Sequence, residues 1–254
     1  MKLKDKVALV TGSSSGIGRG IAIGFAKECA DIIVNYHRRR DAANEVVALI
    51  KKLGRRAIAI GADVSDADQV SSLLNRGWNE FGKIDILVNN AGITKECPLR
   101  EVSEELWDKI LGVNLKGYFL CSQAVSRKMI ENKINGAIIN ISSVNAFQVE
   151  PNRGPYDISK AGINTLTKSL AVELGPHNIR VNAIAFGTIQ GTNIDGNFFG
   201  DNTTLDRIIS KIPLGYLGTV EDCVGPAIFL ASDDSRYIDG ETIVVDGGLS
   251  VKQY

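Results

Sequence analysis

Short, uniformly apolar segments alternate with longer amphipathic segments along almost the whole of this 254-residue chain. The apolar segments are rich in Val and Ile, which is typical of strands covered by helices on both faces. Their expected positions are residues 7–10, 31–35, 57–60, 84–88, 136–141, 179–184 and 241–245. Helices are expected at residues 17–29, 41–53, 66–81, 103–131 (one bent helix or two joined helices), 156–174 and 219–231. Helices between successive strands predict a doubly wound α/β fold with a parallel sheet of about seven strands.

One segment departs from this alternation, because residues 187–212 contain several Gly, Asn and Asp residues. The segment follows the sixth predicted strand, and ligands of doubly wound sheets bind beyond the carboxyl ends of the strands. We therefore predict that residues 187–212 form a lid over the binding site. No linker, repeat or low-complexity segment divides the chain, so residues 1–254 are expected to form one domain.

Charge and composition argue against several classes of function. Lys and Arg (29) balance Asp and Glu (29), so no excess charge favours nucleic acid or an anionic membrane as partner. No segment reaches the roughly 18 apolar residues of a membrane span, and the first residues lack a signal-peptide pattern. The four cysteines are scattered and the only histidines are His37 and His177, so neither a metal site nor a disulfide framework is expected. These features favour a cytoplasmic protein with a small-molecule ligand.

A glycine-rich turn, residues 11–18 (Thr-Gly-Ser-Ser-Ser-Gly-Ile-Gly), joins the first predicted strand to the first predicted helix. Glycines allow a sharp turn and a close approach to a ligand, and the free amides of the following helix attract a pyrophosphate. By itself, such a turn is equally compatible with a tight connection that binds no ligand.

Four further residues form a pattern with chemical meaning. Tyr156 and Lys160 are four positions apart and share one face of a predicted helix. Ser143 lies thirteen residues before Tyr156, at the end of the fifth predicted strand, and Asn114 lies in the long helix before that strand. Ser142 is an alternative to Ser143, and only the spacing to Tyr156 selects between them.

Together, these motifs resemble the classical short-chain dehydrogenase/reductase family. The glycine turn has the Gly-xxx-Gly-x-Gly spacing of the family after Thr, and residues 89–92 (Asn-Asn-Ala-Gly) match a second signature. Asn114, Ser143, Tyr156 and Lys160 have the order and spacing of its catalytic tetrad. The resemblance covers essentially the whole chain. It implies a single Rossmann-type domain and an oxidoreductase that transfers a hydride between nicotinamide and a CH–OH carbon.

The resemblance also implies which residues contact NAD(P). They are Gly12, Ser14, Ser15, Gly16, Ile17, Gly18, Tyr36, His37, Arg38, Asp63, Val64, Asn90, Ala91, Gly92, Tyr156, Lys160, Gly187, Thr188 and Ile189. At the end of the second strand a carboxylate would bind the ribose 2′-hydroxyl of NAD, but Tyr36, His37 and Arg38 stand there. Cationic groups suit a 2′-phosphate, so NADP is favoured over NAD. Arg38 is the best candidate for the residue that binds this phosphate. In the alternative, the arginines only solvate the start of the next helix near Asp41.

The resemblance implies a role for each member of the tetrad. A free phenol has a pKa of about 10, and the Lys160 ammonium and an oxidised nicotinamide are expected to favour the phenolate of Tyr156. Tyr156 then exchanges a proton with the substrate oxygen, and Ser143 hydrogen-bonds the same oxygen. Lys160 would also hold the nicotinamide ribose, and Asn114 would support a water relay.

Segments of this chain resemble two branches of the family. Residues 33–36, 212–216 and 253–254 resemble glucose 1-dehydrogenases and related aldose dehydrogenases, whereas residues 89–94 resemble 3-oxoacyl-acyl-carrier-protein reductases. Ile134 and His177 stand where the reductases often carry Arg, so oxidation of a sugar or polyol is favoured. The alternatives are an NADPH-dependent 3-oxoacyl or carbonyl reductase and a non-catalytic dinucleotide sensor. The complete tetrad argues against the sensor.

The expected substrate contacts are Ser143, Asn145, Tyr156 and Glu96. Polar residues after Ser143 could bind several hydroxyls, or could form an ordinary solvated loop. Phe186 replaces a proline that is usual in the family after the sixth strand, which leaves the nearby nicotinamide contact open. The resemblance further implies a homotetramer built on the helices of residues 103–131 and 156–174 and on the last strand.

Overall fold

Seven parallel strands form the central sheet in the order β3-β2-β1-β4-β5-β6-β7. The structure is a computed structural model that describes residues 1–192 and 202–251. The strands are β1 (Val7–Val10), β2 (Asp31–Tyr36), β3 (Ala57–Gly61), β4 (Ile86–Asn89), β5 (Ala137–Ser143), β6 (Arg180–Phe186) and β7 (Thr242–Val245). The predicted fold class and the predicted number of strands are confirmed.

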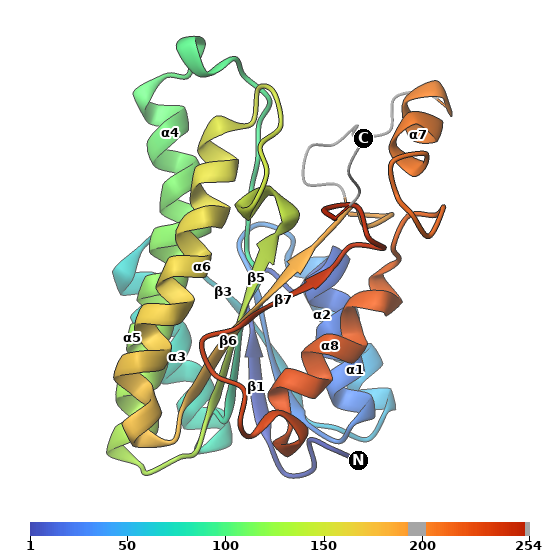
Figure 1. Cartoon of the computed structure of the whole chain (residues 1–254). Helices are drawn as coiled ribbons and strands as arrows, with labels where there is room; N and C mark the ends of the chain where they lie inside the picture. The colour runs from blue at the N-terminus through green and yellow to red at the C-terminus, as the bar shows by residue number, and fades with distance from the viewer. Residues whose placement is uncertain (193–201, 252–254) are drawn as a thin grey trace.

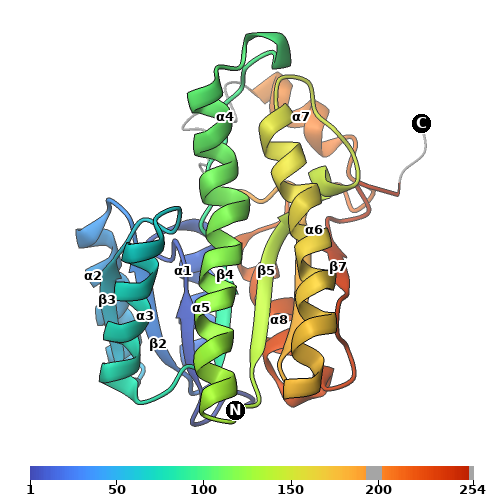
Figure 2. The same cartoon turned by 90° about the vertical axis from the view of Figure 1, so that its left-hand side faces the viewer.

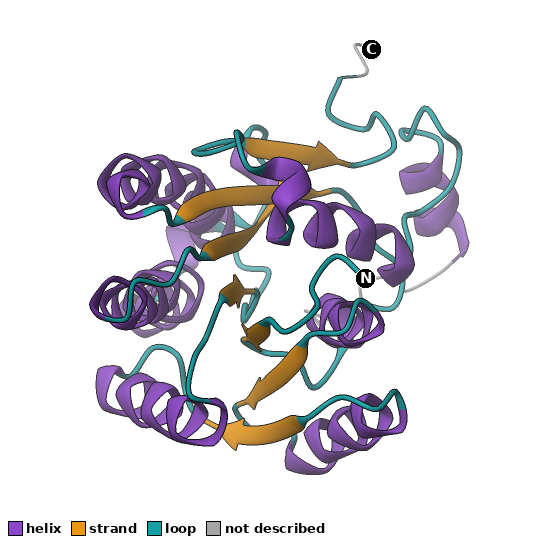
Figure 3. Ribbon diagram, turned by 90° about the horizontal axis from the view of Figure 1, so that it is seen from below, coloured by secondary structure: helices purple, strands orange, loops and turns teal. Residues whose placement is uncertain are grey.

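Helices cover both faces of the sheet, which gives three layers (Figures 1 and 3). One face carries α1 (Gly16–Lys27), α2 (Arg40–Lys52) and α8 (Val220–Ala231). The other face carries α3 (Ala67–Phe81), α4 (Glu104–Leu111), α5 (Gly117–Glu131) and α6 (Gly154–Leu174), as Figure 2 shows. A π-helical turn, Gly112–Lys116, joins α4 to α5, so the joined form of the helix expected over residues 103–131 is the correct one.

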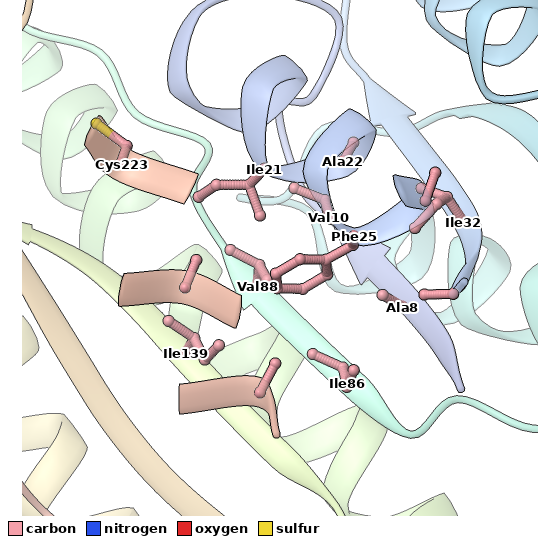
Figure 4. Close-up of a cluster of buried hydrophobic side chains, with 14 of the residues drawn as sticks. Ala8, Val10, Ile21, Ala22, Phe25, Ile32, Ile86, Val88, Ile139 and Cys223 are labelled. Carbon is pink, nitrogen blue, oxygen red and sulfur yellow. The ribbon is translucent and has the colours of Figure 1, made fainter. Parts of the chain in front are cut away.

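The apolar strands supply the core on both sides of the sheet. Between the sheet and α1, α2 and α8, Phe25 packs among residues such as Val10 and Ile139 (Figure 4). A second cluster, which includes Leu9 and Ile138, fills the space under α3, α5 and α6. Burial of alternate strand residues on opposite faces explains why the strands are apolar throughout.

The arrangement of the sheet determines where a ligand site can lie. The strand order changes direction between β1 and β4, which lie side by side although β2 and β3 separate them in sequence. Loops at the carboxyl ends of strands diverge at such a point and leave a crevice for a ligand. The carboxyl ends of strands carry the glycine turn, residues 89–92, Ser143 and Gly187, each at the last residue of a strand or directly after it.

The predicted lid is only partly described. Residues 202–209 form the helix α7 (Asn202–Ile209), which the sequence pattern did not predict. Residues 193–201 lie outside the described residues, so the lid over residues 187–212 stays a prediction.

Replacement of Arg180 by methionine is expected to lower the free energy of unfolding by about 2 kcal/mol, because three hydrogen bonds at a partly buried site are lost. Arg180 donates to the carbonyls of Leu230 and Ser232 at 3.0 and 3.1 Å and to Ser235 Oγ at 2.9 Å, and thereby ties β6 to the end of α8. Urea denaturation measures the change. Arg76→Met on the exposed surface of α3 is the control, and equal effects of the two variants would contradict the prediction.

Candidate active site

The glycine turn and residues 89–92 interlock. Gly12 has a φ of +61°, and a Cβ there would lie 2.9 Å from Ala91 Cα. A Cβ on Gly18 would overlap Asn90 Nδ2, which donates to the carbonyl oxygens of Thr11 at 2.9 Å and Gly12 at 3.3 Å. Two segments about 80 residues apart in sequence therefore form one rigid platform, which the local motifs do not reveal.

The amino terminus of α1 fits a phosphate group. Ser15 occupies the N-cap position without capping the helix through its side chain, whereas Asp66 and Ser103 cap α3 and α4. The first amides of a helix have no intrahelical acceptor and carry a partial positive charge. Gly16 has a φ of +56°, and among residues 1–192 and 202–251 a Cβ on it would meet only Thr192 Cγ2, at 3.7 Å. These features suit the pyrophosphate of a dinucleotide.

Asn35 holds the glycine turn, and the sequence analysis did not identify it. Its buried side-chain oxygen accepts a hydrogen bond from the Gly12 amide at 3.1 Å. Its Nδ2 donates to the carbonyls of Ile60 and Ala62, both at 3.2 Å. One side chain thus ties the turn to β2 and to the end of β3. An Asn inside an otherwise apolar strand was the available signal.

Basic side chains follow β2 beside the glycine turn. Tyr36 ends the strand, half-buried, and His37 and Arg38 are exposed. The structure adds Arg39, whose Nη1 lies 3.5 Å from Ser15 Oγ. A cation from the end of β2 therefore lies against the amino-terminal end of α1.

Asp63 and Val64 follow β3, the strand next to β2, at the same edge of the sheet as the basic residues. His37 Nε2 lies 3.6 Å from Asp63 Oδ2, and Asp63 Oδ1 accepts two hydrogen bonds from Ser65. Burial raises the pKa of Asp63, but the bonds from Ser65 and the charge of His37 outweigh burial, so the net shift is downward and the carboxylate is charged. Val64 is buried against Gly117, where a Cβ would lie 2.8 Å from Val64 Cγ2.

Asn114 is fully buried in the π-helical turn between α4 and α5. Its Oδ1 accepts from the Ile93 amide and its Nδ2 donates to the Ile93 carbonyl, both at 2.9 Å. Nδ2 also donates to Ser159 Oγ at 3.1 Å. Asn114 therefore joins the loop after β4 to α6. Such π-helical turns occur often at functional sites.

The predicted serine and tyrosine lie together at the carboxyl end of β5. Ser143 is the last residue of that strand, and Tyr156 lies in the first turn of α6. Both side chains are buried, and burial raises the pKa of Tyr156, a rise that a hydrogen bond with Ser143 only partly offsets. The hydroxyl of Ser142 instead donates to Asn164 Oδ1 at 2.8 Å. Ser143, and not Ser142, therefore lies against Tyr156, and its catalytic role stays a prediction.

Lys160 lies beside Tyr156, with its Nζ 5.5 Å from the centre of the tyrosine ring and 2.8 Å from the Ile141 carbonyl. Burial raises the pKa of Tyr156 to about 12 and lowers the pKa of Lys160 to about 7. The expectation that the ammonium, together with an oxidised nicotinamide, favours the phenolate stays a prediction. Both groups are withdrawn from water, and burial outweighs the effects of nearby charge.

The predicted substrate contacts Asn145 and Glu96 are engaged with other side chains. Asn145 Nδ2 donates to Asp157 Oδ1 at 2.7 Å. Glu96 is ion-paired with Arg153 at 3.3 Å, and Arg153 also lies 3.2 Å from Glu150. Arg153 is buried three residues before Tyr156 and links the loops after β4 and β5. Asn145 and Arg153 are thus buried and paired, whereas Gln148, Glu150 and Asn152 are exposed, so binding of substrate hydroxyls by this loop stays a prediction.

The strand β6 extends through Phe186 and pairs on both sides. Phe186 is buried and pairs with Ser143 on β5 and Val245 on β7. A Cβ on Gly187 would lie 2.9 Å from Asp246 Cα, so only glycine fits without displacement. Thr188 is half-buried, and Ile189 is buried and forms an isolated bridge to Gly218.

Comparison with known proteins identifies the family. The sequence pattern of a family described as enoyl-(acyl carrier protein) reductase matches residues 12–250. The chain belongs to the short-chain dehydrogenase/reductase family. It is 41% identical to a 2-dehydro-3-deoxy-D-gluconate 5-dehydrogenase from Dickeya dadantii, over 97% of this chain and 96% of that protein. It is equally identical (41%) to a 3-oxoacyl-[acyl-carrier-protein] reductase from Staphylococcus aureus, over 96% of this chain and 98% of that protein.

A solved structure extends the comparison to a ligand-bound relative. The gluconate 5-dehydrogenase from Burkholderia cenocepacia, in complex with NADP and tartrate, superimposes with a TM-score of 0.94. The two chains are 34% identical, and the match covers 99% of this chain and 98% of the Burkholderia chain. The chain is thus an oxidoreductase of a family that acts on CH–OH groups with NAD(P), as the sequence analysis expected.

This short-chain dehydrogenase/reductase was expected to have no metal site and no membrane span. Within residues 1–192 and 202–251, no three His, Cys, Asp or Glu side chains gather as metal ligands would. In the same part of the chain, no helix combines the length and apolar character that crossing a membrane requires.

Proposed function

We propose that this protein is an NADP-dependent dehydrogenase that oxidises a hydroxyl group of a sugar or sugar acid. The observation that carries the proposal is the meeting of Ser143, Tyr156 and Lys160 at the carboxyl end of β5, on the same edge of the sheet as the phosphate cradle of α1. A proton-transfer group next to a dinucleotide site is the arrangement that hydride transfer to or from a CH–OH carbon requires.

In the proposed mechanism, Tyr156 Oη removes the proton of the substrate hydroxyl. Ser143 Oγ hydrogen-bonds the same oxygen and fixes its position. The positive charge of Lys160 Nζ favours the phenolate of Tyr156. Residues 11–18, with Asn90 and Ala91, orient the dinucleotide against this group. The nicotinamide, when bound, supplies the hydride acceptor.

Relatives and site chemistry support a polyhydroxylated substrate. Two of the similar proteins are named for gluconate-type substrates, and the ion-paired rim of Glu96, Glu150 and Arg153 offers polar partners next to Tyr156. An aldose oxidised at its first carbon, as by a glucose 1-dehydrogenase, is included in this class.

A second candidate is an NADPH-dependent 3-oxoacyl or carbonyl reductase. It is supported by the 41% identity to the Staphylococcus aureus reductase and by the exposed apolar Phe147 and Val149 after β5, which could contact an acyl chain.

An absorbance assay of reduced nicotinamide decides between the two. Aldoses, aldonates and polyols are offered with NADP and NAD, and 3-oxoacyl esters are offered with NADPH. Turnover of a sugar or sugar acid supports the first proposal. Turnover of the oxoacyl esters alone would replace it by the second.

Replacement of Arg39 by alanine is expected to lower kcat/KM for NADP about tenfold, since a charge-assisted hydrogen bond contributes about 1.5–3 kcal/mol. The value for NAD should change less than twofold, because NAD lacks the 2′-phosphate. Arg38→Ala is the matched variant, because Arg38 was the candidate from sequence. A larger effect of Arg38→Ala than of Arg39→Ala would show that the contact of Arg39 with Ser15 is not the one that matters.

We further propose a homotetramer in the cytoplasm. Phe119 on α5, Ile158 and Val172 on α6, and Val244 on the edge strand β7 are exposed. The helices α5 and α6 lie side by side toward the viewer in Figure 2. A second copy would cover these apolar surfaces. Sedimentation velocity is expected to give a tetramer for the wild type and a smaller species for the double variant Phe119→Glu/Ile158→Glu.

The cysteines bear on the proposed cytoplasmic location. All four are free thiols, which is compatible with a reducing compartment.

A further inference from the structure

The amine of Lys160 lies in an enclosed environment that the predicted tetrad does not account for. The side chain is buried, and Nζ donates to the Ile141 carbonyl at 2.8 Å. A buried ammonium has three protons to satisfy and is strongly destabilised by loss of water. Burial lowers the pKa of Lys160 to about 7, so groups around Nζ decide how much of the amine is charged at neutral pH.

Tyr118 on α5 is one of those groups. Its ring centre lies 5.5 Å from Lys160 Nζ, the same distance as the ring centre of Tyr156 on α6. Its hydroxyl donates to the Ile141 carbonyl at 3.1 Å, so Tyr118 and Lys160 share one acceptor. Tyr118 is among the largest fully buried side chains of the protein. Burial raises its pKa well above the usual value, so it stays a neutral donor.

We propose that Tyr118 is a positioning residue that holds the Lys160 amine beside Tyr156 and stabilises its charged form. The proposal rests on the proposed roles of Lys160 and Tyr156. The face of the Tyr118 ring attracts the cation, and the hydroxyl anchors the ring to the Ile141 carbonyl that orients the amine. The lysine therefore lies between two tyrosines, of which one reacts and the other supports it.

The ring and the hydroxyl of Tyr118 make separable contributions. Tyr118→Phe keeps the ring over Nζ and removes one hydrogen bond, whereas Tyr118→Leu removes the ring as well. Phe25→Leu is the matched control, because Phe25 is an equally buried ring on the opposite side of the sheet. It reports what the loss of a core ring does to folding without touching Lys160.

The test is the pH dependence of kcat/KM for alcohol oxidation. The titratable and charged groups that act on Tyr156 are Arg153, Glu150 and Asp157. Those that act on Tyr118 are Tyr156 and Cys121, and all of these groups stay in place in the variants of Tyr118. Oxidation requires the Tyr156 phenolate, so a less stable Lys160 ammonium moves the rise of the profile to higher pH. We expect a shift of about one pH unit for Tyr118→Leu, which is about tenfold in rate below the midpoint. Tyr118→Phe should stay within threefold of the wild type.

Several outcomes would overturn the proposal. These are an unshifted profile for Tyr118→Leu, an equal shift for Phe25→Leu, or a loss in Tyr118→Phe as large as in Tyr118→Leu. Tyr156→Phe is measured in parallel. If Tyr156→Phe is inactive and the Tyr118→Leu profile is unshifted, only the role of Tyr118 fails. If Tyr156→Phe retains turnover, the proposed mechanism fails and the role of Tyr118 fails with it.

Discussion

Replacement of Tyr156 by phenylalanine is expected to lower kcat about a thousandfold, within the range that a positioned proton-transfer group contributes. The substitution removes one oxygen atom from a buried ring at the start of α6 and leaves the packing almost unchanged. The variant lacks the phenol oxygen that accepts the proton of the substrate hydroxyl in the proposed mechanism. NADP binding should stay within about threefold, because the cradle of α1 and the basic residues after β2 are untouched.

Two measurements make this prediction specific. Steady-state assays give kcat, and the fluorescence of bound NADPH gives the dissociation constant. Tyr237→Phe is the matched control, because Tyr237 is fully exposed and its hydroxyl should not matter. A Tyr156→Phe variant with more than a tenth of the wild-type kcat would assign the proton transfer to another group. A variant that lost NADP binding as well would make Tyr156 primarily a binding residue.

Replacement of Gly18 by alanine is expected to weaken NADP binding at least about a hundredfold and to lower the free energy of unfolding by about 2 kcal/mol, as overpacking of a dense core does. A Cβ at this position would overlap Asn90 Nδ2 and lie 2.9 Å from the Gly12 carbonyl oxygen. Asn90 would have to move and would lose its bonds to the Thr11 and Gly12 carbonyls. The glycine turn would then lose the shape that directs the α1 amides toward a phosphate.

Gly112→Ala is the control for this substitution. Gly112 also has helical backbone angles, and a Cβ there would meet its nearest neighbour, Ser65 Cβ, at 3.6 Å, which is an ordinary contact. It should therefore be tolerated, since alanine favours helix over glycine. Calorimetric titration with NADP and thermal unfolding measure both effects. Equal affinities for the Gly18 and Gly112 variants would contradict the interlocking of the turn with Asn90.

The fold could be predicted closely from local patterns. Seven apolar segments and the helices between them lie within a few residues of their observed bounds, because burial on both faces of a parallel sheet requires strands without polar alternation. The helix α7 was missed within residues 187–212, although Leu205, Ile208 and Ile209 have helical spacing, because the glycine-rich residues before it led to the whole segment being predicted as a lid. From the sequence, the connection between α4 and α5 could be a bend in one helix or a junction of two helices, since a π-helical turn leaves no sequence signature.

The site could be predicted in part. The spacing of Ser143, Tyr156 and Lys160 reflects a strand end followed by a helix, and the structure brings these side chains together. The expected favouring of the Tyr156 phenolate by Lys160 and an oxidised nicotinamide stays a prediction. Burial raises the pKa of Tyr156 and lowers that of Lys160, and this effect depends on packing that the sequence does not show. Glu96 and Asn145 were predicted as substrate contacts, but their pairing with Arg153 and Asp157 joins residues from different loops.

The sequence by itself determined the order of strands and helices, the glycine turn and the residue types of the tetrad. These properties depend on local periodicity and on the conformational freedom of glycine. Only the tertiary structure decided that Asn35 holds the glycine turn, that Arg39 reaches Ser15 and that Tyr118 lies against Lys160. Each of these contacts joins residues at least 23 positions apart, and the direction of a side chain across such a distance is set by how the helices and strands pack.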